Sequence, residues 1–367
     1  MIVGGEQRIP ITLLTGFLGS GKTTVLNGLL RHPQLRNTAV VVNEFGEIGL
    51  DHLLVRSADE NVVLLDAGCL CCTINNTLRE TLGDLWLGRV RKELPAFDRV
   101  LIETTGLAEP GPILQAITND PFVTDHYRLD GVVACVDALH ALDQLDEQPE
   151  AAHQVAVADR LLLTKTDVVS ERQREAVADR MASLNPAAAI VSAVHGNVAP
   201  EQVLDIGLYD GSHGSPNVER WLNAQGYDAN VEDRPGAPAL AHAHDKSRHG
   251  EHICSHCFYI DHAVSWAGLA AWCDLMAEAH GDALLRVKGI IEITETGKPV
   301  VVHGVHEVFD PPVRLDNWPG KDRRSRLVVI SRDLDERILS RSLAALRLAP
   351  GSGRPASLAE LATTEHD

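Results

Sequence analysis

The stretch GFLGSGKT, residues 16–23, constrains the fold more than any other part of the sequence. It fits the pattern G-x-x-x-x-G-K-[ST], follows an apolar run at 9–14 and opens a helix-like segment at 22–32. Glycines let backbone N–H groups curl around phosphate oxygens, and a helix N-terminus adds partial positive charge. The stretch therefore predicts a strand, a phosphate-binding loop and a helix, in that order.

The roles of the loop residues follow from the same pattern. The ammonium of Lys22 is expected to reach the β- and γ-phosphates of a nucleotide, and the Thr23 hydroxyl to bind Mg²⁺. Such a loop serves ATP and GTP alike, so the base must be identified from a separate signal. The residues expected to contact the nucleotide here are Gly16, Gly19, Ser20, Gly21, Lys22, Thr23 and Thr24.

Short apolar runs recur along the first half of the chain. Each is bounded by polar or turn residues, as expected of strands buried on both faces. Helix-like segments, such as 22–32 and 170–184, lie between several of them. The alternation predicts an α/β fold, with a mostly parallel sheet and helices on both sides. The runs cover residues 9–14, 38–42, 61–65, 98–103, 130–136, 159–163 and 188–191.

The length of 367 residues exceeds what one typical core accommodates, so we expect two domains. The predicted first domain, of the P-loop type, covers 1–206, and a linker rich in Gly, Pro and His covers 207–254. A smaller α+β domain is expected over 255–348, followed by a frayed tail over 349–367.

Charge and hydropathy argue against several classes of partner. The chain carries 33 Lys and Arg against 51 Asp and Glu, a formal net charge of −18. A nucleic-acid or anionic-membrane binder needs a basic face, so neither partner is expected. No apolar run approaches the ~18 residues that span a bilayer, and no signal peptide is visible. The expected location is the cytoplasm, where thiols stay reduced.

The sequence LLLTKTD, residues 161–167, identifies the base. Lys165 can cover a purine face with its aliphatic stem, and the Asp167 carboxylate can accept from the guanine N1–H and 2-amino groups. Adenine lacks both donors, so Asp167 selects guanine. The usual motif begins with Asn where this chain has Thr164. Ser192 and Ala193 follow another strand, where a backbone N–H is expected to meet the guanine O6.

The sequence LIETTGLAEP, residues 101–110, supplies the reaction side of the site. Glu103 ends a strand and is expected to reach Mg²⁺ through water, and Gly106 is the expected sensor of the γ-phosphate. The next position is Leu107 rather than a water-orienting Gln. We therefore expect slow intrinsic hydrolysis. The predicted catalytic residues are Lys22, Thr23, Glu103 and Gly106.

Three cysteines lie close together in DAGCLCCT, residues 66–73. Thiolates at Cys69, Cys71 and Cys72 suit Zn²⁺, Cu(I) and Co²⁺, and three ligands leave one position of a tetrahedral ion open for exchange. Buried structural cysteines and a redox centre are the alternatives. Glu44, in NEFGE, is a candidate additional ligand. Both segments follow strands, which places them near the expected γ-phosphate and suggests that the nucleotide controls metal affinity.

A second group of potential metal ligands lies in HAHDKSRHGEHICSHC, residues 242–257. Two readings stay open, an arm that loads or buffers metal and a solvated linker that happens to be His-rich. The potential ligands in this segment are His242, His244, His249, His252, Cys254, His256 and Cys257.

Taken together, GFLGSGKTT, NEFGE, GCLCCT, ETTGLAEP and TKTD occur in the order of the CobW-type P-loop GTPases. The chain resembles this family over essentially its whole length, and within it the YjiA-like branch of zinc-transferring metallochaperones. Thr164, in place of Asn, and the His-rich insertion are departures.

The resemblance implies a GTP-dependent metal carrier that binds Zn²⁺ or Co²⁺ and passes it to client metalloproteins. It also implies a CobW-type C-terminal domain and leaves a homodimer open. Cobalt delivery for cobalamin synthesis and activation of a metal-dependent hydratase are alternatives within the family. An ATP-dependent kinase would leave TKTD and CLCC unexplained, and a simple zinc store would leave the nucleotide motifs unexplained.

Overall fold

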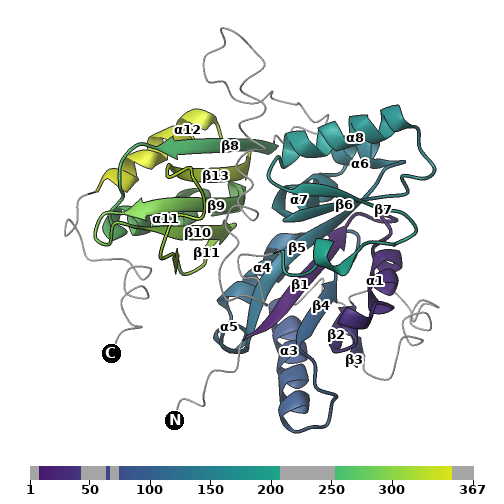
Figure 1. The fold of residues 1–367 in the computed structure, drawn as a ribbon. Coiled ribbons are helices and arrows are strands. Elements are labelled where there is room, and N and C mark those ends of the chain that lie inside the picture. The colour runs from purple at the N-terminus through teal and green to yellow at the C-terminus, as the bar shows by residue number, and fades with distance from the viewer. Residues whose placement is uncertain (1–7, 43–62, 67–73, 207–252, 349–367) are drawn as a thin grey trace. The chain divides into compact units, whose positions relative to one another are not determined.

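The computed structural model describes residues 8–42, 63–66, 74–206 and 253–348, which fold as two compact units. The first unit contains a seven-stranded sheet in the order β3-β2-β4-β1-β5-β6-β7, with every neighbouring pair parallel (Figure 1). The predicted α/β fold is therefore confirmed. The strands are β1 (Ile9–Gly16), β2 (Thr38–Val42), β3 (Val63–Asp66), β4 (Arg99–Glu103), β5 (Tyr127–Asp137), β6 (Arg160–Thr164) and β7 (Ala189–Ala193).

Helices connect the strands wherever the connection is described, as crossovers between parallel strands require; the connection between β2 and β3 lies outside the described residues. Proline occupies the start of three of them, where its missing N–H costs no hydrogen bond. The side chain of Asp120 caps α5 by accepting from the N–H groups of Phe122 and Val123. The helices are α1 (Lys22–Leu30), α3 (Ile74–Val90), α4 (Pro110–Asn119), α5 (Pro121–His126), α6 (Ala141–Glu147), α7 (Pro149–Val157) and α8 (Glu171–Leu184), with 3₁₀ turns η1 (Pro33–Leu35) and η2 (Pro200–Gln202).

The core of the first unit lies on both faces of the sheet. Leu14, at the end of β1, packs with Leu26 and Leu29 of α1 on one face. The neighbouring Leu13 points to the opposite face, and its side chain is also fully buried. Continuous apolar runs of this kind are what strands covered on both sides need.

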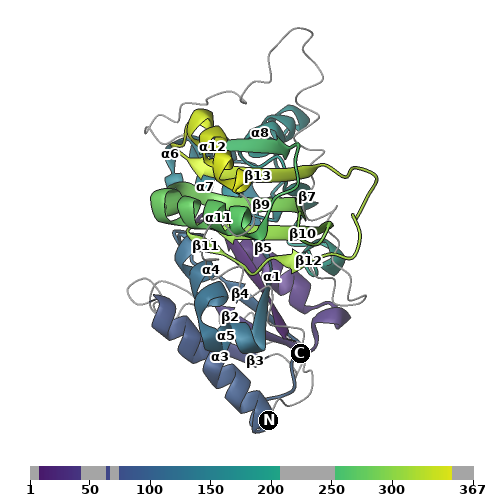
Figure 2. The ribbon, with the colours of Figure 1, turned by 90° about the vertical axis from the view of Figure 1, so that its left-hand side faces the viewer.

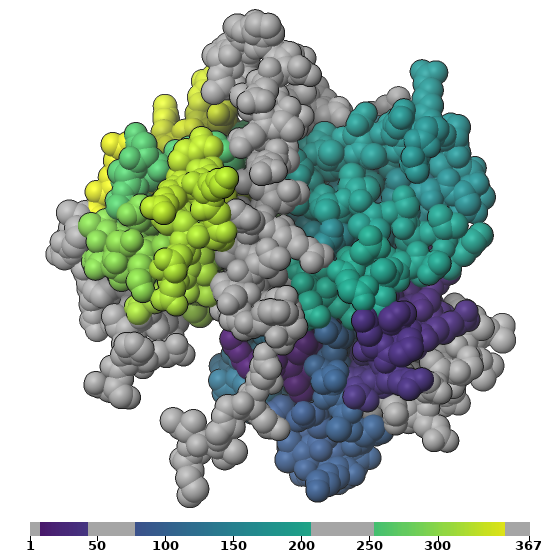
Figure 3. Space-filling view, viewed as in Figure 1, coloured from purple at the N-terminus to yellow at the C-terminus, as the bar shows by residue number. Residues whose placement is uncertain are grey.

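The segment over residues 8–42 and the segment that ends at residue 206 lie side by side, although they are far apart in sequence. In Figure 3 their purple and teal surfaces are continuous. The Gln34 side chain donates to Glu201 over 2.8 Å, which ties η1 to η2.

The second unit contains an antiparallel sheet in the order β11-β10-β9-β13-β8, with β12 paired to β10. Helix α11 runs along this sheet (Figure 2), and the Ser265 side chain caps it by accepting from the Gly268 N–H. The elements are β8 (Ile253–Ile260), α11 (Trp266–His280), η3 (Gly281–Ala283), β9 (Leu284–Ile293), β10 (Lys298–Val305), β11 (Val308–Phe309), β12 (Val313–Arg314), β13 (Ser325–Arg332), α12 (Glu336–Ser342) and η4 (Leu343–Arg347).

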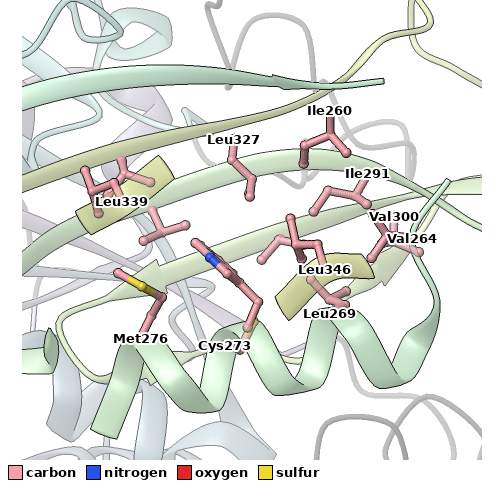
Figure 4. Packing of buried hydrophobic residues seen from close by; sticks show 14 of the residues in the cluster. Ile260, Val264, Leu269, Cys273, Met276, Ile291, Val300, Leu327, Leu339 and Leu346 are labelled. Carbon is pink, nitrogen blue, oxygen red and sulfur yellow. The ribbon is translucent and has the colours of Figure 1, made fainter. Parts of the chain in front are cut away.

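One apolar cluster holds the second unit together. Leu269, Cys273 and Met276 of α11 face Ile291 and Leu327 of the sheet (Figure 4). These helix positions are spaced by four and three residues, so they form one stripe on the helix surface. The expected α+β character of this unit is confirmed by its sheet and helices.

The predicted linker over 207–254 and tail over 349–367 lie almost entirely outside the described residues, and the domain limits stay predictions. The structure does place the first strand of the second unit at Ile253, two residues before the expected start at 255. None of the helices within the described ranges is long and apolar enough to cross a membrane.

Candidate nucleotide-binding site

The predicted nucleotide residues all lie at one edge of the parallel sheet. Parallel strands end at the same edge, so the residues that follow them are brought together. The strand order places Glu103 at the end of β4, the phosphate loop after β1, and the TKTD segment at the end of β6. Ser192 and Ala193 end β7. The edge thus runs from the expected Mg²⁺ side, past the phosphate loop, to the expected base side.

Three glycines of the phosphate loop adopt backbone angles that other residues rarely adopt. The φ values are 140° at Gly16, 72° at Gly19 and 87° at Gly21. A Cβ on Gly16 would also lie 2.4 Å from the Cys135 carbonyl oxygen and 2.7 Å from Ser20 Oγ. Glycine at position 16 is therefore required both by the turn and by the close approach of β5.

Lys22 is buried at the start of α1 and folds over the loop that precedes it. Its Nζ donates to the carbonyl oxygens of Gly16 at 2.9 Å and Phe17 at 3.2 Å. Burial lowers the pKa of Lys22, and the nearby Glu103 carboxylate partly offsets this effect. The ammonium is thus held in the loop where phosphate oxygens are expected.

Thr23 and Glu103 are 80 residues apart in sequence and in direct contact. Thr23 Oγ1 donates to Glu103 Oε1 over 2.7 Å, and Glu103 is buried at the end of β4. A hydroxyl and a carboxylate are hard oxygen donors, the ligands that Mg²⁺ prefers. The pair therefore fits a magnesium ion beside the phosphate loop. Thr24, the last predicted loop residue, is part of α1.

Gly106 lies against the phosphate loop. A Cβ at this position would lie 2.7 Å from both the backbone nitrogen and the Cα of Leu18. No larger residue fits without moving one of the two loops. The structure therefore brings the expected γ-phosphate sensor into contact with the loop that is expected to bind the phosphates.

The base side contains a residue that the sequence analysis did not single out. Asp137, at the end of β5, accepts from Lys165 Nζ over 2.7 Å and contacts His140 Nδ1 over 2.8 Å. Lys165 has a φ of 54°, a left-handed conformation. Asp167 lies beside His195, with 3.6 Å between its Oδ2 and the ring Nε2. The sequence signal for Asp137 was its place as the acid that ends an apolar strand.

Hydrogen bonding determines the ionisation of Asp137. Burial, the largest single influence, raises its pKa, but hydrogen bonds from His140, Lys165 and the Leu139 N–H outweigh it. The pKa of Asp137 therefore lies below its ordinary value. An ionised Asp137 holds the Lys165 ammonium at a fixed point of the expected base site.

Thr164, which stands where the usual guanine motif has Asn, forms a structural contact of its own. Its Oγ1 lies 2.8 Å from the Ser20 carbonyl oxygen and 3.1 Å from the Val136 carbonyl oxygen, and its single hydrogen is donated to the nearer, Ser20. The hydroxyl is buried and connects β6 to the phosphate loop.

The loop after β7 packs closely against α1, with backbone in contact with backbone at two glycines. A Cβ on Gly28 would lie 2.3 Å from the Gly196 carbonyl oxygen, and one on Gly196 would lie 2.3 Å from the Thr24 carbonyl oxygen. Gly196 has a φ of 74°. The end of β7, with the buried Ala193 and the exposed Ser192, is thus fixed next to the helix that begins at the phosphate loop.

The residues of the first predicted metal site lie outside the described part of the chain. They are Cys69, Cys71, Cys72 and Glu44. The strands that precede them are described. Val42 of β2 pairs with Asp66 of β3 on one side and with Glu103 of β4 on the other. The chain therefore leaves β2 and β3 next to the carboxylate of the expected Mg²⁺ site.

The second predicted metal group is only partly described, because His242, His244, His249 and His252 lie outside the described residues. Cys254, His256 and Cys257 belong to β8. Side chains alternate along a strand, so Cys254 and Cys257 point to opposite faces of the sheet and do not converge on one ion. Within the described ranges, no group of three or more His, Cys, Asp or Glu residues is placed to hold a metal.

Two protein-family models match the chain. The CobW/HypB/UreG nucleotide-binding domain matches residues 10–192, and the cobalamin synthesis protein cobW C-terminal domain matches residues 253–347. The zinc chaperone YjiA of Escherichia coli is 33% identical over 343 residues, covering 92% of this chain and 99% of that protein. The zinc-regulated GTPase metalloprotein activator 1 of Schizosaccharomyces pombe is 29% identical, covering 89% and 83%.

A solved structure is also similar. The zinc-bound YjiA GTPase from Escherichia coli superposes with a TM-score of 0.66 at 28% identity. The match covers 94% of this chain and all of that one.

Proposed function

Because the chain belongs to the CobW/HypB/UreG family of P-loop GTPases, we propose that it hydrolyses GTP and carries zinc, which it transfers to client metalloproteins in a GTP-dependent manner. The nucleotide lies along the carboxyl edge of the first sheet. Its phosphates contact the loop at 16–23, and its base contacts the segments that end β6 and β7.

Lys22 and the backbone N–H groups of the loop bind the phosphates. The Thr23 hydroxyl and the Glu103 carboxylate would hold Mg²⁺, which would supply positive charge where negative charge develops on the phosphates. Glu103 Oε1 already accepts from Thr23 Oγ1 over 2.7 Å, so it orients that hydroxyl. Gly106 contacts the γ-phosphate and so distinguishes GTP from GDP.

Guanine is selected by Asp167, which accepts from its N1–H and 2-amino groups. Lys165 covers the base, and Asp137 fixes its ammonium at 2.7 Å. The backbone at Ser192 and Ala193 donates to O6. Intrinsic hydrolysis is slow, because Leu107 supplies no group to orient the attacking water.

Zinc is the cargo, bound by Cys69, Cys71 and Cys72, with Glu44 as an additional ligand. Thiolate chemistry supports zinc as the cargo. The register of β2, β3 and β4, which aligns Val42, Asp66 and Glu103, supports a position near the nucleotide. Covalent geometry limits Glu44 and Cys69 to about 7 Å and 11 Å of chain beyond the strand ends. A zinc site on these segments lies close enough to the γ-phosphate to respond to it.

Nucleotide control of zinc affinity follows from this proximity. A tenfold change in zinc affinity between nucleotide states corresponds to about 1.4 kcal/mol of coupling, and zinc must then change GTP affinity equally. The test is a zinc competition titration in the GDP state and with a non-hydrolysable GTP analogue. Different affinities support the proposal, and equal affinities in the two states contradict it.

The same thiol set accepts Co²⁺, so the titration is repeated with that ion. Tighter binding of zinc than of cobalt, in whichever nucleotide state binds metal more strongly, supports zinc as the cargo. Tighter binding of cobalt than of zinc overturns that assignment. We place the protein in the cytoplasm, with client metalloproteins as partners. A homodimer is tested by its mass in solution in each nucleotide state.

A further inference from the structure

Two neighbouring polar residues interrupt the buried apolar part of α7. His153 and Gln154 are both buried in a helix whose other residues from 151 to 157 are Ala and Val. Burying an imidazole and an amide is costly unless they form hydrogen bonds. Both side chains reach the same loop, at 106–109, which follows β4 and contains the expected γ-phosphate sensor.

Gln154 holds the start of this loop. Its Nε2 donates to the carbonyl oxygens of Gly106 at 3.2 Å and Ala108 at 3.1 Å. Two carbonyl acceptors determine which end of the amide faces the loop, because the amide oxygen cannot donate. One side chain therefore uses both N–H groups to fix two peptide units of the loop.

His153 holds the end of the loop. Its Nδ1 lies 3.0 Å from Glu109 Oε1 and 3.1 Å from Oε2, immediately before α4 begins at Pro110. On its other side the loop contacts the phosphate loop, where Gly106 leaves no space for a Cβ beside Leu18. The loop is thus enclosed between α7 and the phosphate loop.

From these contacts we infer that Gln154 is a positioning residue, which sets Gly106 at the distance from the phosphate loop that γ-phosphate recognition requires. The inference rests on the proposed role of Gly106. Gln154 touches neither the nucleotide nor the metal in this account. Its effect appears in the difference between GTP and GDP affinities, because GDP has no γ-phosphate for Gly106 to contact.

Gln173 provides a matched control on the base side. Its Nε2 also donates to two loop carbonyls, those of Ala138 at 3.3 Å and Leu139 at 3.2 Å. The same substitution at either glutamine removes two hydrogen bonds from a side-chain amide to loop carbonyls, although Gln173 is more exposed than Gln154. At Gln173 the affected loop follows β5 and faces the base, which GTP and GDP share.

The experiment compares Gln154→Met with Gln173→Met in the full chain, with Mg²⁺ present. The affinities for GDP and for a non-hydrolysable GTP analogue are measured by calorimetry, with the Tm of each variant. Gln154→Met loses both hydrogen bonds to the loop, and we expect it to lower analogue affinity about tenfold relative to GDP, equivalent to about 1.4 kcal/mol. Gln173→Met is expected to leave the ratio of the two affinities unchanged.

An unchanged ratio in Gln154→Met, or an equal loss for both nucleotides, overturns the inference, because a purely structural role acts on both states. If Gln154→Met does not fold, Gln154→Asn, which keeps the amide but shortens its reach to the two carbonyls, is measured instead, and a shift of the ratio in the same direction supports the inference. Gly106→Ala separates the inference about Gln154 from the proposed role of Gly106 itself. If it shifts the ratio and Gln154→Met does not, only the inference fails; if it leaves the ratio unchanged, the proposed role of Gly106 fails too.

Discussion

Thr164 donates its hydroxyl hydrogen to the carbonyl oxygen of Ser20 over 2.8 Å, which joins β6, the strand that ends in the TKTD segment, to the phosphate loop. A hydroxyl at this position therefore fixes the end of β6 to the phosphate loop, although it cannot supply the carboxamide of the more usual Asn.

Thr164→Val retains the side-chain shape and removes the donor. We expect it to weaken GTP and GDP binding alike, about fivefold or more, because a buried hydrogen bond is worth about 1 kcal/mol and its loss leaves the Ser20 carbonyl without this donor. Titration with fluorescent GDP and GTP measures the effect. Thr164→Ser, which keeps the hydroxyl, is the control. A Thr164→Val variant that binds both nucleotides as tightly as the unchanged protein would show that the hydrogen bond to Ser20 does not support nucleotide binding.

Asp167→Asn should exchange guanine for xanthine. The carboxylate accepts two hydrogen bonds from guanine, each worth about 1.5–3 kcal/mol for a charged acceptor, so GTP affinity should fall at least about 100-fold. Xanthine carries a carbonyl in place of the 2-amino group, which the new amide can bind by donation. Binding of XTP and GTP is compared directly, and a variant that keeps its GTP affinity would show that Asp167 does not read the base.

Glu103→Gln should weaken Mg²⁺ binding without removing the nucleotide. The carboxylate orients the Thr23 hydroxyl over 2.7 Å, and loss of such an orienting partner costs about 10–100-fold in metal affinity. The Mg²⁺ concentration that half-saturates GTP hydrolysis should rise accordingly. Nucleotide affinity measured without Mg²⁺ is the control and should change less; an unaltered Mg²⁺ dependence would remove Glu103 from the metal site.

The cysteines should divide into two classes in a zinc titration. Replacing Cys69, Cys71 and Cys72 by Ser should abolish tight binding. Cys254→Ser with Cys257→Ser should retain it, because β8 places those thiols on opposite faces. Competition against a chromogenic chelator provides the measurement. Loss of tight binding only in the strand variant would reverse the assignment.

The buried thiol of Cys135 provides an internal reference for that experiment. Burial raises its pKa to about 12, so it stays protonated at neutral pH and neither binds zinc nor reacts quickly with alkylating reagents.

Asp137→Asn should release Lys165 from its fixed position. We expect the affinities for GTP and GDP to fall together by about two- to tenfold, because a charged partner is lost from a partly exposed lysine. The pKa of Asp137 lies below its ordinary value, so its contribution to stability is fully present above the pKa of the unfolded chain. It is lost only as the pH falls through the lower folded value. Titration of Asp137 should therefore cause no change in GTP or GDP affinity between pH 6 and 8. Asp137→Glu keeps the charge but moves the carboxylate, and so tests whether its position matters.

The strands of the first unit could be predicted because each is a continuous apolar run with a polar boundary. The limits of β5 could not, since it extends back to Tyr127 through polar residues. Asp130 is buried there, and burial raises its pKa against the opposing effect of Arg99. Thr12 donates to Asp130 over 3.0 Å, and such partners arise from distant parts of the chain.

The site divides in the same way. Motif residues such as Lys22 and Asp167 occupy fixed offsets from strand ends, so their spacing reveals them. Asp137 and Gln154 act through partners 28 and 48 residues away, a relation that appears only when the sheet is assembled. In β8 the strand period places Cys254 and Cys257 on opposite faces, and the role of the whole 242–257 segment stays a prediction, because four of its histidines lie outside the described residues.

The contact between Gly28 and Gly196 restricts which parts of the site are free to move. The Gly28 and Gly196 backbones leave no space for a Cβ, and the Thr24 side chain lies beside Gly196, so a rotation or shift of α1 at this crossing would displace the loop after β7. The phosphate loop and the base side thus have few independent degrees of freedom.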